Sequence, residues 1–375
     1  MQLRDKIVMR VMTISPSKRG SASQTVTLME DIFSYGATPR ELDDPIDLGT
    51  ATEPRNVDNQ IVSTAPYYVL ARAVGDSAAQ NYDYPRVATM VLPVSGADDV
   101  RDVELMRQVT DEFSGTYYAT VAFLDDQSAF GLPQDIFPEV ITQIQDTSVL
   151  SGVSPGDLLM IGTGEDAELA QFTGVSSDGS NFKLKRGVLD TVPKNWPTGT
   201  QMVTIKRDTS TLDLREHAIG ENISYKLLPT TSLGSLQVDD ATPFGHTTSD
   251  RHYLPYRPSG ITFQSALGFS FTENVTIDEW EFSWSNRNRL SETTVVLTWD
   301  DASVTPEPGH QSVIRAYRNG TIYETVTIND SNVTQHTFEP PIGDRVPGDV
   351  WTFEFDAEVD GLTALQPSTV IVTLQ

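Results

Sequence analysis

The 375-residue sequence contains no cysteine, which excludes disulfides, thiolate metal sites and cysteine nucleophiles. It also lacks an apolar run of about 20 residues, so no membrane-spanning helix is expected. Arg4, Lys6 and Arg10 interrupt the first apolar residues, so no usual export leader is expected either. Basic residues are few, with 26 Lys and Arg against 52 Asp and Glu, and no basic run exceeds a pair. Because clustered cations bind phosphate backbones, we expect no nucleic-acid partner.

Signatures of catalysis and of cofactor binding are missing as well. The sequence has no Gly-x-Ser-x-Gly elbow, no phosphate-binding glycine loop and no complete calcium-loop pattern. Acidic pairs such as Asp300-Asp301 are adjacent in sequence rather than opposed across a cleft. Of the five histidines, His246 and His252 come nearest to a metal spacing, without fitting acidic partners. We expect no enzyme, no cofactor and no metal site.

What the sequence does contain favours β structure. Its 25 Gly and 22 Pro, with many Thr, Ser and Val, are typical of short strands separated by turns. We predict a mainly β, multi-domain protein with four successive regions. They are an N-terminal α+β docking region (1–147), a small antiparallel β domain (148–208), a strand plus an extended Pro-containing connector (209–258) and a C-terminal fibronectin type III-like or immunoglobulin-like β-sandwich (259–375).

The N-terminal region has mixed signals. Residues 40–57 are polar and predict a loop that becomes ordered on assembly. Apolar spacing predicts short helices at 98–113 and 136–144, and β-rich runs predict strands at 6–14, 67–73, 87–94 and 117–124.

In the next two regions, turn residues mark the ends of the expected strands more clearly. Asp178-Gly179 between alternating runs predicts a tight hairpin. One strand at 222–228 precedes a connector stiffened by Pro255 and Pro258. The small β domain should contain strands at 158–162, 169–175, 182–185 and 202–206.

The last region alternates strongly. Trp280, Phe282 and Trp284 recur at period two, which places them on one face of a strand. Asn319-Gly320 predicts a hairpin between two further strands. About seven short strands in about 115 residues is the pattern of a sandwich without inter-sheet cysteines. The other strands are expected at 313–317, 321–328, 351–359 and 369–374.

Several strings then match a known family. In the last region these are the string from Phe282 to Leu290 (FSWSNRNRL), Pro306-Glu307-Pro308-Gly309 and Arg315-Ala316-Tyr317. Upstream are the string from Arg186 to Thr191 (RGVLDT) and Tyr256-Arg257-Pro258. Together they resemble the terminal fibronectin-type module, the small β domain and the proline-rich connector of bacteriophage tail-tip, or baseplate hub, proteins, which are related to gene transfer agent hubs.

The resemblance implies a structural role. It implies a virion protein of the tail tip, made in the host cytoplasm, whose partners are other tail-tip or baseplate proteins, the host surface receptor and copies of itself in a homotrimer. Two alternatives stay open. One is an adhesin that binds a receptor or glycan, and the other is a tail-associated polysaccharide hydrolase.

Three residues are candidates for interface or loop anchors. Arg287 and Arg289 have alternate spacing that places both guanidinium groups on one side. They can pair within the domain with Asp300, Asp301 or Glu307, or contact a neighbouring subunit. Trp196 lies in a turn and is the most plausible exposed aromatic residue. Trp284 and Trp351 are expected in the core, and Trp280 and Trp299 are either core residues or sugar-stacking platforms.

Overall fold

The chain divides into two compact units, residues 1–49 and residues 50–375, in a computed structural model that is mainly β as predicted. Among the described residues, no helix has the length and hydrophobicity needed to cross a membrane. The structure describes residues 9–16, 24–30, 53–57, 60–91, 100, 102–109, 112–118, 120–121, 139–143, 153–162, 164, 166–175, 181–197, 200, 202–205, 212–213 and 215–375.

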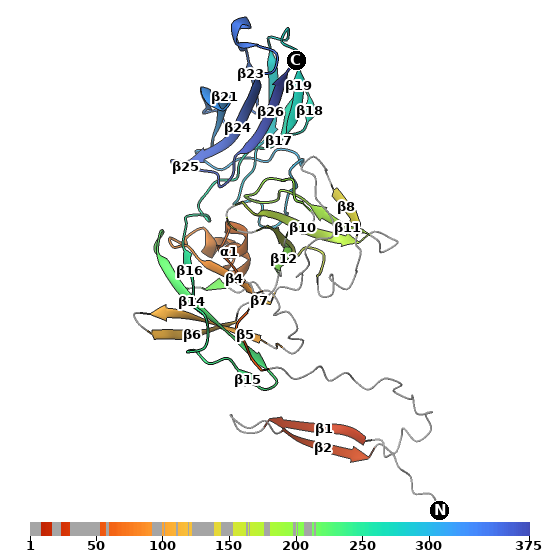
Figure 1. The fold of residues 1–375 in the computed structure, drawn as a ribbon, viewed down its shortest axis with the longest axis vertical. Coiled ribbons are helices and arrows are strands. Elements are labelled where there is room, and N and C mark those ends of the chain that lie inside the picture. Colours follow the sequence, from red (N-terminus) through yellow and green to blue (C-terminus); the bar gives the residue numbers. More distant parts are fainter. Residues whose placement is uncertain are drawn as a thin grey trace, which may run out of the picture. The chain divides into compact units, whose positions relative to one another are not determined.

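The first unit contains an antiparallel hairpin of β1 (Met9–Pro16) and β2 (Gln24–Glu30), drawn in red in Figure 1. The strand predicted at 6–14 is thus confirmed over residues 9–14, and residues 6–8 lie outside the described residues. A register shift between Val11 and Thr13 marks a bulge in β1.

The second unit begins with a sheet in the order β13-β4-β3, with β7 beside β4. Its strands are β3 (Gln60–Thr64), β4 (Val87–Val91), β7 (Thr120–Val121) and β13 (Leu212–Asp213). The helices α1 (Tyr67–Val74) and α2 (Asp76–Ala79) lie between β3 and β4 in sequence.

The strand predicted at 67–73 is wrong, because the segment forms α1. Tyr67, Tyr68 and Val69 have strand propensity, but residues 67 to 71 are all buried, which hides the helical period. The helix starts after Pro66 and ends at Gly75, whose φ of 88° breaks it.

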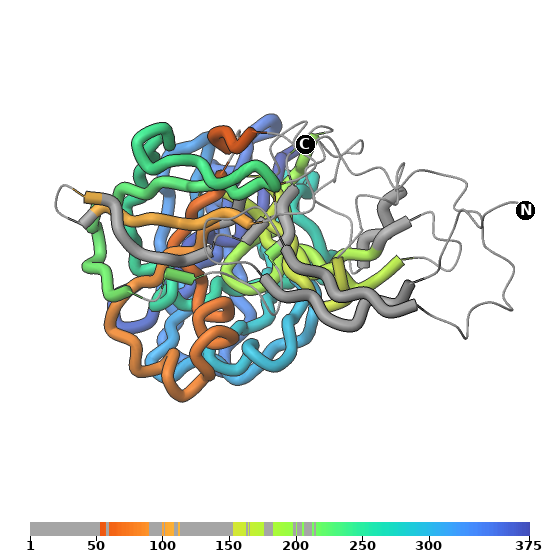
Figure 2. Tube along the Cα trace, turned by 90° about the horizontal axis from the view of Figure 1, so that it is seen from below, coloured from red at the N-terminus to blue at the C-terminus, as the bar shows by residue number. Residues whose placement is uncertain are grey.

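A second sheet joins distant parts of the sequence. Its order is β15-β14-β5-β6, with β16 beside β14. Figure 2 shows β14, in green, running beside β5, in orange. The strands are β5 (Asp102–Val109), β6 (Glu112–Tyr118), β14 (Asn222–Thr231), β15 (Gly234–Ser235) and β16 (Phe244–Thr247).

Two predictions fail in this sheet. The helix predicted at 98–113 is wrong, since Val103 and Leu105 alternate with more exposed residues in β5 and pack against Ile223 and Leu227 of β14. The prediction of one strand followed by an extended connector in 209–258 is too simple, because β15 and β16 both pair with β14. A short apolar run does not distinguish a helix turn from a strand that has partners on both sides.

The third sheet has the order β12-β9-β10-β11-β8. All four strands expected between 158 and 206 are confirmed, but the helix expected at 136–144 is wrong, because β8 pairs with β11. The residues of the predicted Asp178-Gly179 turn and most of the predicted loop at 40–57 lie outside the described residues. The strands are β8 (Glu139–Gln143), β9 (Leu158–Ile161), β10 (Glu168–Val175), β11 (Asn181–Lys185) and β12 (Met202–Ile205).

This sheet shares its core with other regions. Leu158 and Leu169 belong to the same cluster of buried residues as Tyr67 and Leu70 of α1. Val296, from a long loop of the C-terminal sandwich, belongs to it as well. The small sheet and the helix are therefore packed as one body.

The C-terminal region is a two-layer sandwich (Figure 1). One sheet has the order β18-β17-β20-β23, and the other has the order β19-β26-β24-β21-β22 with β25 beside β24. A short 3-10 helix, η3 (Ile342–Asp344), precedes β24. The strands are β17 (Ser259–Phe263), β18 (Ala266–Leu267), β19 (Ser270–Glu273), β20 (Trp280–Ser285), β21 (Gln311–Arg318), β22 (Thr321–Ile328), β23 (Gln335–Phe338), β24 (Val350–Val359), β25 (Leu362–Thr363) and β26 (Ser368–Leu374).

The strand order identifies the sandwich as a fibronectin type III fold. Apart from the edge strands β18 and β19 and the short β25, its first, second and fifth strands form one layer (β17, β20, β23), and the other four form the second layer (β22, β21, β24, β26). Trp280, Trp299 and Trp351 are fully buried, so all three are core residues rather than sugar platforms. Trp280 and Trp351 meet edge to face with ring centroids 5.5 Å apart.

Candidate functional site

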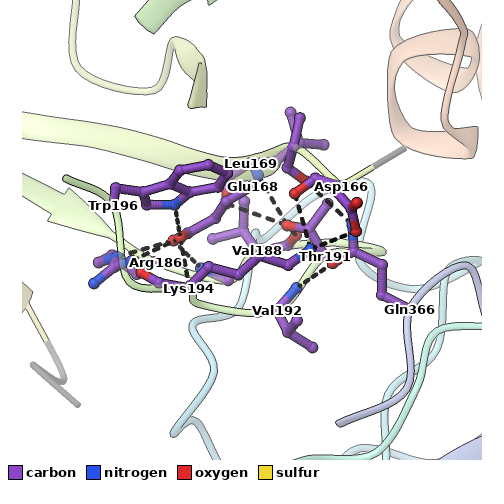
Figure 3. A network of polar contacts seen from close by, with 12 residues as sticks. Asp166, Glu168, Leu169, Arg186, Val188, Thr191, Val192, Lys194, Trp196 and Gln366 are labelled. Atoms are coloured by element: carbon purple, nitrogen blue, oxygen red, sulfur yellow. Dashed lines mark hydrogen bonds and ion pairs between the residues drawn. The ribbon is translucent and has the colours of Figure 1, made fainter. Parts of the chain in front are cut away.

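Glu168 and Arg186 form the centre of a buried polar network, which Figure 3 shows. Glu168 begins β10, and Arg186 follows β11, its antiparallel neighbour. The guanidinium donates from Nε to Oε1 at 2.9 Å and from Nη2 to Oε2 at 2.6 Å. The backbone amides of Gly187 and Lys194 also donate to the carboxylate. Every acceptor direction of this buried charge is therefore used by the fold itself.

The turn after Arg186 has a tightly constrained backbone. Gly187 has a φ of +54°, and a Cβ there would lie 2.3 Å from Cδ of Pro193. Leu189 also has a positive φ, of 58°. Thr191 closes the turn, because its hydroxyl oxygen accepts from the Leu169 amide at 2.9 Å. These contacts explain the glycine and the threonine of the string from Arg186 to Thr191.

Arg257 fills the inside of the same turn. Its guanidinium donates to the carbonyl oxygens of Gly187, Leu189 and Thr191. The side chain is buried beside the Trp299 ring, 5.4 Å from its centroid. Burial, together with the nearby Arg287, lowers the pKa of Arg257 to about 10, so the group stays charged at neutral pH.

Two further contacts extend the network. Arg251 donates to both carboxylate oxygens of Asp190, at 2.6 Å and 3.0 Å. Gln366, from the sandwich, accepts from the Val192 amide and donates to the carbonyl of Ala167, both at 3.2 Å. The sandwich is thus hydrogen-bonded directly to the small sheet.

Arg287 is buried and binds backbone carbonyls rather than carboxylates. It donates to the carbonyl oxygens of Thr298, Trp299, Asp301 and Ala302. It therefore organises the long loop between β20 and β21. The predicted pairing with the side chains of residues 300, 301 or 307 is wrong for this arginine, because its guanidinium group donates to backbone carbonyl oxygens of the loop.

Arg289 does pair with Glu307, with Nε and Oε2 3.1 Å apart. It also donates to the carbonyl of His252 at 3.0 Å and lies over the Tyr67 ring, 5.3 Å from its centroid. The two arginines do not share one strand face as expected, because β20 ends at Ser285 and both lie in the loop after it. Arg289 links the sandwich loop to the 209–258 region and to α1.

The prediction of Trp196 as an exposed aromatic is wrong. The side chain is half-buried, and its indole Nε1 donates to Glu168 Oε2 at 2.8 Å. Its ring packs over Gly162, where a Cβ would lie 2.6 Å from the ring. Trp196 therefore belongs to the polar network in Figure 3.

The chemistry of this network is that of a fixed joint. The carboxylates and guanidinium groups at its centre are shielded from solvent and bonded to one another or to backbone, so no group is presented to a substrate. Within the described ranges, no group of three His, Asp or Glu side chains could hold a metal ion. His246 contacts Thr64, and His252 is buried with its pKa lowered to about 4, chiefly by burial.

Sequence reasoning missed three residues of the network, which are Glu168, Arg251 and Gln366. Glu168 lies directly before the strand predicted at 169–175, where a buried charge requires a partner. No sequence pattern marks Gln366 as part of the network, because its partners are backbone groups far away in sequence. We name this set the junction, defined as Glu168, Arg186, Gly187, Asp190, Thr191, Trp196, Arg251, Arg257, Arg287, Arg289, Glu307 and Gln366.

No family model and no curated protein matches the chain. Among solved structures it is similar to domains d3-d4 of the rat CD45 extracellular region, at 8% identity and a TM-score of 0.22, over 45% of this chain and 72% of that chain. The FN1-FN3 domains of chicken CNTN1 give 9% identity and a TM-score of 0.20, over 74% of this chain and 64% of that chain. A segment of two fibronectin type III domains from chicken tenascin gives 12% identity and a TM-score of 0.20, over 63% of this chain and 97% of that chain. Scores this low establish no shared arrangement, so the sandwich is identified by its strand order.

Proposed function

We propose that the protein is a structural component of a phage tail tip or baseplate hub, without catalytic activity. In this role it assembles as a homotrimer with other tail proteins and presents its sandwich toward the host surface. The assignment to the virion rests on the sequence resemblance, and the nature of the junction supports an architectural role.

The observation that carries the proposal is the meeting of the family-like strings in one buried joint. Arg186 to Thr191 forms the turn, Arg257 fills it, and Arg289 pairs with Glu307 beside it. Residues from four separate strings thus hold one arrangement of the small sheet and the sandwich. A rigid joint of this kind suits a protein that transmits position and load within an assembly.

Mass spectrometry of purified virions tests the proposal, and a low-resolution reconstruction of the particle with labelled protein locates it. We expect the chain in the particle, at the tail tip, in three copies per tail. The formal charge of −26 must be offset at the interfaces, so assembly should depend on salt. Absence from virions would reject this function.

A second candidate, glycan or receptor binding, is favoured by a polar groove on the sandwich. The groove has a volume of about 460 Å³ and is lined mainly by residues of β17, β20 and β23, including Thr262, Glu281, Ser283, Gln335 and Thr337. Hydroxyl, amide and carboxylate groups can hydrogen-bond sugar hydroxyls. A glycan array with the full chain and a Gln335→Ala, Thr337→Ala variant tests it. Signals unchanged by the variant would count against this groove.

A further inference from the structure

The β1–β2 hairpin has one apolar face, as its strand register shows. Ile14 pairs with Val26, and Val11 pairs with Leu28. Residues 26 and 28 share a face of β2 because side chains alternate along a strand. Their four positions therefore form one apolar face, and Met9, opposite Glu30, extends it.

The bulge is what keeps this face continuous. Without it, the odd-numbered Val11 and the even-numbered Ile14 would occupy opposite faces of β1. The register shift between Val11 and Thr13 inserts Met12 and restores the alignment. The opposite face then contains Arg10 with Met29, Thr13 with Thr27, and Ser15 with Thr25.

Nothing in the described part of the chain completes this sheet. The hairpin is a two-stranded sheet in a compact unit of its own, and no third strand among the described residues pairs with it. Isolated two-stranded hairpins are marginal in water, and stability requires a third strand or a surface covering the apolar face. The apolar face therefore needs a surface that covers it.

Charge indicates which partner. Residues 1–30 contain three more basic than acidic side chains, whereas residues 31–49 carry −4 and the whole chain carries −26. Residues 50–375 are thus left with a formal charge of −25. The basic segment that contains the hairpin, residues 1–30, and an acidic body are complementary between two copies of the same chain.

We propose that the apolar face of the β1–β2 hairpin docks on the acidic body, residues 50–375, of a second copy of this chain. Burial of the four paired apolar residues supplies the adhesion, and the opposite charges orient the encounter. The same contact repeated around a rotation axis closes a ring. This contact makes the hairpin one of the surfaces through which the copies associate. It rests on the proposed function only in expecting several copies.

Sedimentation velocity on the full chain tests the contact with two matched double variants. Ile14→Asn with Val26→Asn alters a cross-strand pair on the apolar face, and Thr13→Asn with Thr27→Asn alters the adjacent pair on the polar face. Neither changes the charge. We expect the first to weaken self-association by on the order of tenfold to a hundredfold, and the second to leave it within about twofold. Wild-type oligomers should also dissociate between about 50 mM and about 500 mM salt.

A wild-type chain that stays monomeric at high concentration and low salt overturns the proposal, as do two variants that weaken association equally. Retention of DNA by a monomeric chain overturns it too, by making nucleic acid the partner. For localisation, oligomers of mixed ¹⁴N and ¹⁵N copies are crosslinked with a carbodiimide, which joins Lys to Asp or Glu. We expect links between copies from Lys6 or Lys18 to acids within 50–375, and links confined to one copy or to hairpin pairs reject the body as the site.

The two proposals fail separately. Self-association through the hairpin in a chain absent from virions rejects the viral role and keeps this contact. A chain that is found in virions but whose crosslinks between copies lie elsewhere keeps the viral role and rejects this contact.

Discussion

Glu168 and Arg186 form a two-point ion pair whose side chains are 0% and 1% exposed. Removing two charges from water is costly, and the pair is stable only because backbone amides and the Trp196 indole complete its hydrogen bonds. The pair therefore specifies one geometry for the turn after β11. Within this turn, the carbonyl oxygen of Gly187 accepts a hydrogen bond from Arg257, which lies in the segment that leads into the sandwich.

Glu168→Gln should destabilise the protein strongly. The amide leaves the guanidinium of Arg186 charged and buried, which costs about 3 to 5 kcal/mol. Urea unfolding at neutral pH measures the loss. The matched control is Asp166→Asn, because Asp166 pairs with Lys194 while its side chain is 93% exposed. The control should cost less than about 1 kcal/mol, and equal losses would contradict a central role for the buried pair.

Gly187→Ala should also unfold the turn. The new Cβ would lie 2.3 Å from the Pro193 ring, in a backbone with φ of +54°. We expect a loss of more than about 3 kcal/mol from overlap and backbone strain together. Gly164→Ala is the comparison, since its φ is +75° and no atom lies within 4 Å of its Cβ. Thermal unfolding that affects both variants alike would mean that the proline contact is unimportant.

Gln366→Ala should loosen the sandwich from the small sheet. The change leaves the Val192 amide and the Ala167 carbonyl without these partners, at a cost of about 1 to 3 kcal/mol. Differential scanning calorimetry should then show the sandwich melting apart from the rest. Gln264→Ala removes an exposed hydrogen bond within the sandwich and should leave the profile unchanged. A single unchanged transition in Gln366→Ala would show that the shared cores alone couple the two parts.

The sandwich could be predicted well from sequence because its signals are local. Trp280, Phe282 and Trp284 alternate along β20, and Asn319-Gly320 forms the turn between β21 and β22. The predictions for the N-terminal region failed where pairing with a strand that is distant in sequence determines the local structure. Residues 102 to 109 form β5 because β14, more than a hundred residues later, pairs with them.

The junction could be predicted only in part for a similar reason. The sequence marks Arg287 and Arg289 as unusual cations in an acidic chain, but not whether they bind carboxylates or carbonyls. That choice depends on the loop from Thr298 to Ala302 folding around Arg287. Glu168 and Trp196 meet only after β10 and the turn beyond β11 are assembled, so spacing along the chain gives no indication of the contact.

Glu292 should make the stability of the protein depend on pH. Burial raises the pKa of this carboxyl to about 7, with Arg287 and a hydrogen bond from the Asn288 amide offsetting part of the rise. The folded state therefore binds the proton more tightly than the unfolded state, whose pKa is about 4.3. This contribution is fully present below about pH 4, falls as pH rises toward 7 and is constant above that.

Glu292→Gln should remove that part of the pH dependence and raise stability at pH 8 relative to wild type. The gain is at most about 4 kcal/mol, because each unit between the folded and the unfolded pKa is worth about 1.4 kcal/mol and the folded pKa already includes the attraction of Arg287. Urea midpoints at about pH 5 and pH 8 measure the difference, with Glu279→Gln as an exposed control in the same sandwich. If wild type and Glu292→Gln lose stability in parallel between these pH values, the carboxyl is already ionised in the folded protein and other groups produce the slope.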